Sequence, residues 1–201
     1  MGRILVIGAS GTIGQAAVEA LRGRHEVVCA SAHRSAHQLD ATQASSVEAL
    51  YKAVGRVDGV VVALGGVHFG ELDTMTPAQF LSGLQDKLMA QVQCVLLGQP
   101  WMNDGGSFTL TSGITAHCPI RTGTNASAVN MALEGFVRGA AVDLARGMRI
   151  NLVSPTVLEA SAALYAPYFP GFEPVSAHRV GLAYVRSVDG GDTGQVYRVG
   201  Y

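Results

Sequence analysis

The stretch Val6–Gly14, VIGASGTIG, decides the fold of this chain of 201 residues. Its three glycines, Gly8, Gly11 and Gly14, follow the apolar run Arg3–Ile7 and precede an amphipathic helical pattern. The first glycine allows a tight turn, the second lets the backbone approach a pyrophosphate, and the third lets the helix pack close to the strand. The free N–H groups at the start of that helix favour an anion. The stretch therefore predicts a dinucleotide-binding turn.

Short apolar runs alternate with helical patterns along the rest of the chain. We expect strands at Arg3–Ile7, Glu26–Ala30, Gly59–Leu64, Ser107–Thr111, Arg149–Val153 and Gln195–Val199. We expect helices over about Ile13–Leu21, Ser45–Val54, Pro77–Gly98 and Asn125–Ala145, and one that begins near Ser176. Alternation of this kind, with near-continuous apolar strands, predicts a single α/β domain over residues 1–201. Its fold class is a Rossmann fold with a doubly wound, mostly parallel sheet.

Three local signals refine this organisation. Ser45-x-x-Glu48 has the spacing of a capping box, and Thr76 followed by Pro77 is a second helix start. The segment Pro155–Pro174 holds four of the seven prolines and four aromatic residues. We expect it to be a loop that covers a substrate cleft.

Composition excludes several classes of protein. The net charge is -1 and the basic residues are scattered, so a nucleic-acid partner is not expected. No apolar stretch approaches the roughly 20 residues that span a bilayer, and no signal peptide is evident. The three cysteines are far apart, which argues against a disulfide framework and against a zinc site. We therefore expect a cytoplasmic protein that binds no metal, does not associate with a membrane, and acts on a small molecule.

The end of the second strand bears on the choice of dinucleotide. An acidic residue there would bind the 2′-hydroxyl of an NAD ribose, but no Asp or Glu occurs between the end of that strand and Asp40. Instead His33 and Arg34 follow the strand, and a guanidinium suits a 2′-phosphate. This favours NADP(H), with NAD(H) as the alternative if Arg34 is only a solvated surface residue.

The quoted motifs resemble the short-chain dehydrogenase/reductase family over essentially the whole chain. GASGTIG matches its cofactor turn, and LDATQASSVEAL, VVALGG, INLVSPTV and TGQVYRVG resemble its later segments. The resemblance implies an oxidoreductase with a nicotinamide cofactor. Together with the residues above, it implies cofactor contacts at Gly8, Ser10, Gly11, Thr12, Ile13, Gly14, His33, Arg34, Asp40, Ala41, Ala63, Leu64, Gly65, Thr111, Pro155, Thr156 and Val157.

The chain departs from this family at the catalytic residues. The family uses a Ser and a Tyr-x-x-x-Lys pair, in which Tyr gives the proton and Lys lowers its pKa. One alignment places these three positions at Gly113, Ala126 and Asn130, and the neighbouring one at Ser112, Asn125 and Val129. Neither alignment supplies the Tyr or the Lys, so the usual proton donor is absent.

Other side chains are candidates for the missing role. Lys87, one of only two lysines, lies at or near the position where the family often has a helix Asn in its proton relay. The alternative is a lysine on the helix surface. Replacement acids also include His117 and Cys118. The residues we select as catalytic candidates are Ser112, Lys87, Asn125, Tyr165 and Tyr168.

Two functions remain open from the sequence. The first is an NADP(H)-dependent oxidoreductase that acts on a small or medium carbonyl compound or activated alkene with a non-standard proton donor. The second is a non-redox NADP-binding protein, such as a sensor, isomerase or cyclase, on the same fold. Apolar and small residues on the helices Phe80–Gly98 and Asn125–Ala145 favour a homodimer or homotetramer.

Overall fold

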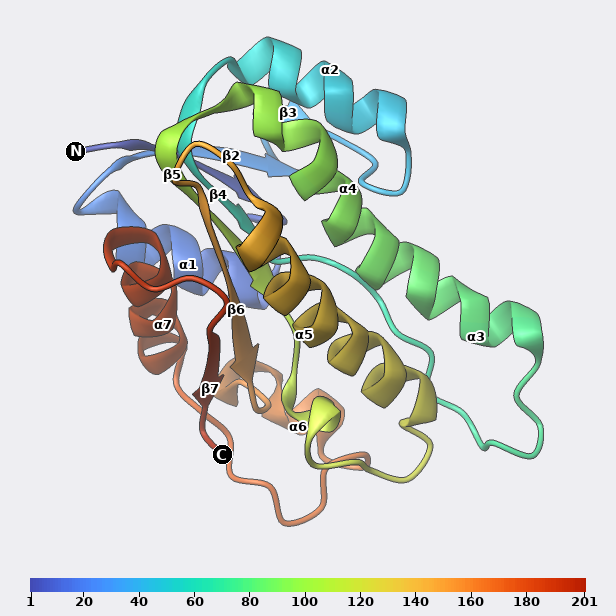
Figure 1. Ribbon diagram of the computed structural model, residues 1–201. Helices are drawn as coiled ribbons and strands as arrows, with labels where there is room; N and C mark the ends of the chain where they lie inside the picture. The colour runs from blue at the N-terminus through green and yellow to red at the C-terminus, as the bar shows by residue number, and fades with distance from the viewer.

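A seven-stranded sheet lies between two layers of helices in the computed structural model, which describes residues 1–201 (Figure 1). The strand order is β3-β2-β1-β4-β5-β6-β7, and every neighbouring pair is parallel. The predicted α/β Rossmann fold with a doubly wound sheet is confirmed. The strands are β1 Arg3–Ile7, β2 Glu26–Ser31, β3 His37–Gln38, β4 Val57–Val62, β5 Met102–Thr111, β6 Arg149–Pro155 and β7 Val196–Val199.

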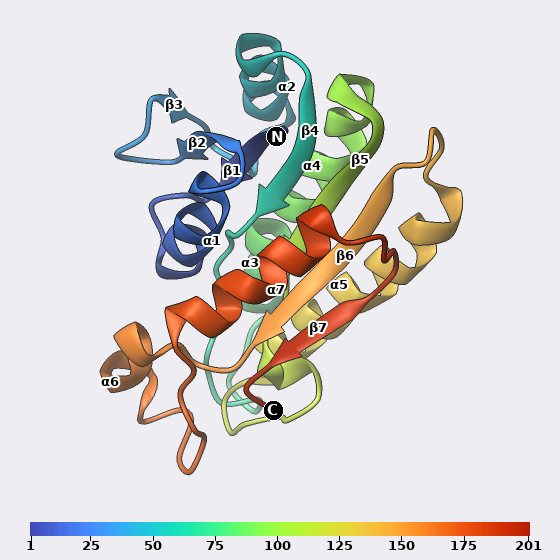
Figure 2. The same cartoon turned by 90° about the vertical axis from the view of Figure 1, so that its left-hand side faces the viewer.

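Helices cover both faces of the sheet because side chains alternate along each strand. In β1, Leu5 and Ile7 enter a core shared with α2 (Ala44–Val54), α4 (Ala90–Gly98) and α5 (Thr124–Asp143). Ile4 and Val6 enter the other core, which α1 (Thr12–Arg22) and α7 (Ala177–Asp189) close. Figure 2 shows α1 and α7 side by side on that face. None of the helices is long and apolar enough to cross a membrane.

Several boundaries differ from the sequence expectation. The two-residue strand β3 was not predicted, and β4 lies two residues earlier than expected. The capping box at Ser45 and Glu48 is wrong, because α2 begins at Ala44 and its N-cap, Gln43, makes no side-chain cap bond. Thr76 is confirmed as the cap of α3, with reciprocal bonds to Gln79.

The long helix expected over Pro77–Gly98 is interrupted. It consists of α3 (Pro77–Gly83), a π-helical turn η1 (Leu84–Met89) and α4. A π-turn inserts one residue into the helix and occurs frequently at functional sites. The spacing of apolar residues did not reveal it, because the helix resumes the same course on both sides.

The segment expected as a plain loop, Pro155–Pro174, contains the turn η4 (Glu159–Ser161) and the short helix α6 (Ala162–Tyr165). We call residues 156–174 the lid. Its two ends are joined by a bridge between Leu158 and Val175. The lid therefore leaves β6 and leads into α7 (Ala177–Asp189) through one narrow neck.

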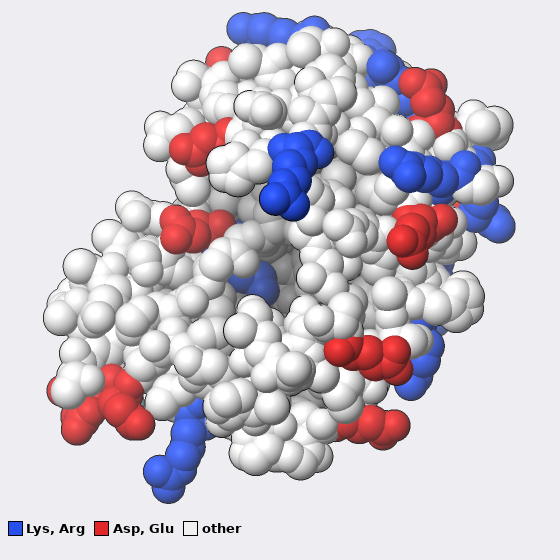
Figure 3. All heavy atoms as spheres, turned by 180° about the vertical axis from the view of Figure 1, so that it is seen from behind, with Lys and Arg blue, Asp and Glu red and all other residues white.

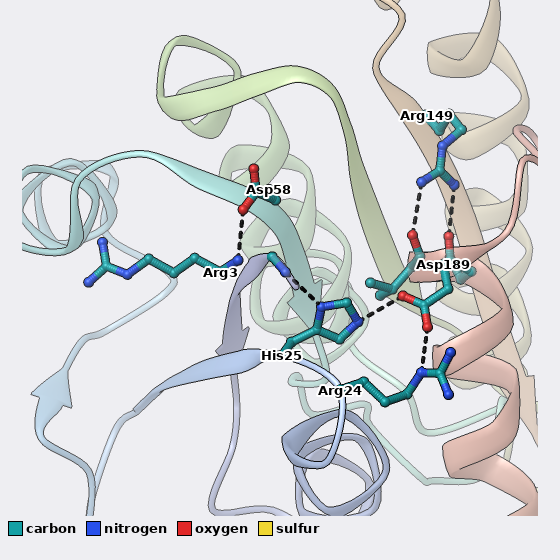
Figure 4. Close-up of polar contacts among 9 residues, drawn as sticks. Arg3, Arg24, His25, Asp58, Arg149 and Asp189 are labelled. Carbon is teal, nitrogen blue, oxygen red and sulfur yellow. Dashed lines mark hydrogen bonds and ion pairs between the residues drawn. The ribbon is translucent and has the colours of Figure 1, made fainter.

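Polar contacts fasten the opposite, amino edge of the sheet (Figure 4). Asp189, at the end of α7, accepts hydrogen bonds from Arg24 Nε at 2.6 Å and His25 Nε2 at 2.7 Å. The other ring nitrogen of His25 accepts from the Gly2 amide at 3.2 Å. Arg149 donates to two carbonyl oxygens in the last turn of α7. These contacts join α7 to the starts of β1, β2 and β6.

Candidate functional site

The glycine turn between β1 and α1 forms an anion-binding backbone. Gly8 has φ of 88°, and a Cβ on Gly8 or Gly14 would collide with a backbone carbonyl. The N-cap Gly11 has no side-chain cap bond, and the first amides of a helix have no intrahelical acceptor. Ser10, Gly11 and Thr12 are exposed. The turn therefore offers free N–H donors and a positive helix end to a phosphate.

A cavity of about 540 Å³ adjoins this turn at the end of β2. Several predicted cofactor residues line it, namely Gly8, His33, Asp40, Ala41 and Leu64. Ser31, at the end of β2, is buried, and its hydroxyl donates to the His33 carbonyl. This pocket has the position expected for the adenosine half of a dinucleotide.

Arg34 lies on the turn beside this cavity. Its φ of 57° is unusual for a residue with a side chain. The Ser35 hydroxyl donates to the Cys29 carbonyl at 2.7 Å and closes the turn. Arg34 is exposed, so its guanidinium is accessible to a ligand from solution.

Lys87, on the π-turn η1, lies against the segments that follow β4 and β5. Gly65, after β4, has φ of 115°, and a Cβ there would lie 2.5 Å from Lys87 Cα. The π-turn therefore packs directly on Gly65. Lys87 Nζ donates to the carbonyl oxygen of Ser112, just past β5, at 3.3 Å. Figure 3 shows a hollow on the back of the molecule, with a basic side chain at its floor.

Burial changes the acid strength of Lys87. The side chain is partly buried, and loss of solvent lowers its pKa from 10.5 to about 8. No carboxylate forms an ion pair with it. An amine with such a pKa exchanges a proton readily near neutral pH.

The other polar candidates have their side chains engaged elsewhere. The Ser112 hydroxyl donates to the Asn130 carbonyl at 3.0 Å and is buried. Asn125 accepts from the His68 amide at 2.9 Å and donates to the Phe80 carbonyl at 2.7 Å. In this geometry Ser112 contributes its carbonyl oxygen to the Lys87 site, and Asn125 positions the segment after β4.

One of the two alignments places the family's catalytic positions at Gly113, Ala126 and Asn130, where this chain carries different chemistry. Gly113 has no side chain, and Ala126 is buried. Asn130 Nδ2 donates to Thr115 Oγ1 at 2.7 Å, whereas its Oδ1 is buried without a partner. An unpartnered amide oxygen accepts a hydrogen bond from a ligand or a water.

The remaining predicted residues lie around the same edge. The Thr111 hydroxyl donates to the Val62 carbonyl at 2.7 Å and forms a second hydrogen bond with the Tyr184 hydroxyl. The Thr111 hydroxyl therefore stabilises the core. The Thr156 hydroxyl is buried without a partner at the end of β6. Tyr165 and Tyr168 lie in the lid, with no side-chain hydrogen bond to the Lys87 group.

Sequence reasoning did not single out Gln91, one helical turn after Lys87. Its side chain is fully buried, donates to the Leu64 and Thr111 carbonyls, and accepts from the Thr111 amide. It thereby fixes the helix that carries Lys87 to the ends of β4 and β5. Only its place on the buried face of that helix signals this role. His117, one of the candidate replacement acids, forms a hydrogen bond of 2.7 Å with the buried Glu134.

The face expected to form an oligomer interface contains a groove between α4 and α5 of about 330 Å³. Gly135, Phe136, Gly139 and Val95 are among its lining residues. Leu96 and Met131, on the same two helices, are exposed.

Comparison with known proteins agrees with this architecture. A family model described as enoyl-(acyl carrier protein) reductase matches residues 8–196. A Listeria innocua protein of known structure is 42% identical, with a TM-score of 0.96, over 98% of this chain and 99% of that one.

Two further relatives are more distant. A Mycobacterium tuberculosis protein described as an uncharacterized oxidoreductase is 25% identical over 191 residues, 79% of this chain and 68% of that protein. A small-chain dehydrogenase solved in complex with NADPH is 23% identical, with a TM-score of 0.84, over 98% of this chain and 95% of that one. The glycine turn, the parallel sheet and the family match together show that the chain belongs to the short-chain dehydrogenase/reductase family.

Proposed function

We propose that the protein is an NADP(H)-dependent oxidoreductase that reduces a small or medium carbonyl compound or activated alkene, with Lys87 as proton donor. One observation carries the proposal. The Lys87 ammonium is held at the ends of β4 and β5, on a π-turn packed against Gly65, with its pKa lowered to about 8. It thus places a titratable acid in the cleft of a chain that lacks the family's Tyr and Lys.

The cofactor site fits the proposed dinucleotide. The amides of Ser10 and of Thr12–Gly14 would hold the pyrophosphate, and the cavity lined by Asp40 and Ala41 would take the adenosine. Arg34, with His33, would bind the 2′-phosphate. The ends of β4 and β6, at Ala63–Gly65 and Pro155–Val157, would line the nicotinamide. The NADPH complex of the distant relative with this fold supports this choice of cofactor.

The chain's own groups would handle the proton. When bound, the nicotinamide would supply the hydride for the substrate carbon. As negative charge develops on the substrate oxygen, the Lys87 ammonium donates its proton and becomes a neutral amine. The Ser112 carbonyl orients the ammonium, and Gln91 holds the supporting strand ends. Water restores the proton after the product leaves.

The test is NADPH consumption with aldehydes, ketones, enones and imines, alongside calorimetric binding of NADPH. Turnover with at least one carbonyl compound or enone, lost in Lys87→Met, supports the proposal. Tight NADPH binding without turnover of any substrate contradicts it. That outcome favours the non-redox alternative, to which the missing Tyr-x-x-x-Lys pair also points.

We also propose that copies of the chain pair through α4 and α5. The groove at Gly135 and Gly139 lets two helices approach closely. Gly139→Arg should convert a dimer or tetramer to smaller species in light scattering coupled to gel filtration. A wild-type protein that is monomeric at high micromolar concentration contradicts this pairing.

A further inference from the structure

A set of aromatic rings crosses the carboxyl edge of the sheet. Phe69 lies in the segment after β4, and the Tyr168 ring of the lid lies 4.9 Å from it between centroids. The Tyr165 ring lies 6.4 Å from Phe69. Because β5 runs between β4 and β6, the ring contacts join two segments that leave the sheet on either side of the end of β5. That end holds Ser112, whose carbonyl oxygen accepts the Lys87 hydrogen bond.

The segment that carries Phe69 is held by hydrogen bonds on both sides of this residue. The amide of His68, just before it, donates to Asn125 Oδ1, and the amide of Gly70, just after it, donates to the Thr122 carbonyl at 2.9 Å. Asn125 is fully buried and is bonded on both sides of its amide. The backbone on both sides of Phe69 is therefore tied to the segment that begins α5.

The lid half is held differently. Beyond its neck at Leu158 and Val175, the lid contacts the Phe69 segment through rings. Tyr168 is 39% exposed, and Phe169 and Phe172 continue the set within the lid with edge contacts. A ring contact of this type contributes only about 0.5–1.5 kcal/mol beyond burial, so it can open without disturbing the core.

We propose that Phe69, Tyr165 and Tyr168 form an aromatic roof over the Lys87 site that selects flat substrates, namely aromatic or conjugated aldehydes and ketones. This inference rests on the proposed function. A flat ring that enters below the roof gains offset or edge contacts with these rings. A puckered ring of similar size keeps its apolar burial but loses that geometry. The carbonyl group of the flat substrate would then face Lys87.

The test compares two substrates of nearly equal size, benzaldehyde and cyclohexanecarboxaldehyde. Wild-type kcat/KM should favour benzaldehyde by roughly 3- to 10-fold. Phe69→Leu should reduce this ratio toward one, mainly by raising KM for benzaldehyde. Phe172→Leu is the matched control, because its ring contacts Phe169 in the lid, and it should keep the preference.

A binding measurement makes the inference independent of turnover. Calorimetry with NADPH-saturated protein, which cannot react with an alcohol, should show tighter binding of benzyl alcohol than of cyclohexylmethanol, with the difference lost in Phe69→Leu. If both aldehydes are reduced equally well, or Phe172→Leu abolishes the preference as fully as Phe69→Leu, the roof does not select flat substrates and the proposed reductase function stands. If the alcohols bind with the expected ratio but no carbonyl compound turns over, the roof stands and the reductase function falls.

Discussion

The two edges of the sheet are built in opposite ways. At the amino edge, polar side chains bond to one another, as Asp189 does with Arg24 and His25. At the carboxyl edge, the first amides of α1, Asn130 Oδ1 and the Thr156 hydroxyl lack partners, and an ammonium is partly buried without a carboxylate. Unpartnered buried groups cost stability. The comparison indicates that the amino edge stabilises the fold, and the unpartnered groups of the carboxyl edge fit its proposed role in binding and reaction.

The largest expected effect comes from the carboxyl edge. Lys87→Met should lower kcat roughly 10²- to 10⁴-fold, because the general acid is lost. The same change should raise the melting temperature at pH 7. Burial lowers the pKa of Lys87 to about 8, so below that pH the folded protein bears the cost of a charged, partly desolvated ammonium that the variant lacks. Steady-state kinetics and calorimetric melting measure the two effects.

The chain offers a matched control for this change in its only other lysine. Lys52 is exposed on α2, so Lys52→Met should leave both kcat and the melting temperature close to wild type. A Lys87→Met protein that is active at the wild-type rate removes Lys87 from the chemistry.

A smaller effect should separate the two cofactors. Arg34→Ala should weaken NADPH binding roughly 10- to 100-fold, since a charge-assisted bond contributes about 1.5–3 kcal/mol. NADH lacks the 2′-phosphate, so its affinity should not change. Calorimetric titration of both cofactors measures the difference. Equal weakening of NADPH and NADH binding, or no change in either affinity, would show that Arg34 does not bind the 2′-phosphate.

The pH dependence of the reaction sharpens the role of Lys87. Reduction needs the protonated amine, so kcat should be flat below pH 8 and fall about tenfold per pH unit above it. Oxidation of the alcohol needs the neutral amine, so its rate should rise to a plateau above pH 8. In Lys87→Arg the guanidinium stays charged, and whatever activity remains should show no bend at this pH. An unchanged bend in that variant assigns the titration to another group.

The sequence predicted the parts of the site that the backbone builds. Gly8, Gly11 and Gly14 predict the turn because each answers a steric demand that can be read from spacing, and the order of elements follows from the alternating pattern. The sequence could not show where side chains from distant elements meet. Lys87 stood out because lysines are scarce and because it lies at or near the family's helix Asn position, but its approach to Ser112 depends on the π-turn and on Gly65. Gln91 and Phe69 carry no motif, since their roles follow from tertiary contacts alone.

The smallest expected effect breaks the amino edge and should leave catalysis intact. Partial burial raises the pKa of Asp189, but hydrogen bonds from Arg24 and His25 outweigh this and lower it below 3.8. A lowered carboxyl pKa gives stability that is full above the unfolded value and lost as the pH falls through the folded value. Asp189→Asn should therefore cost about 1 kcal/mol in urea unfolding at pH 7 and less at pH 3. Asp104→Asn, which loses only an exposed pair with Arg146, should cost less at pH 7. A large loss of kcat in Asp189→Asn at unchanged cofactor affinity would mean that the amino edge affects the reaction at the carboxyl edge and does not act on stability alone.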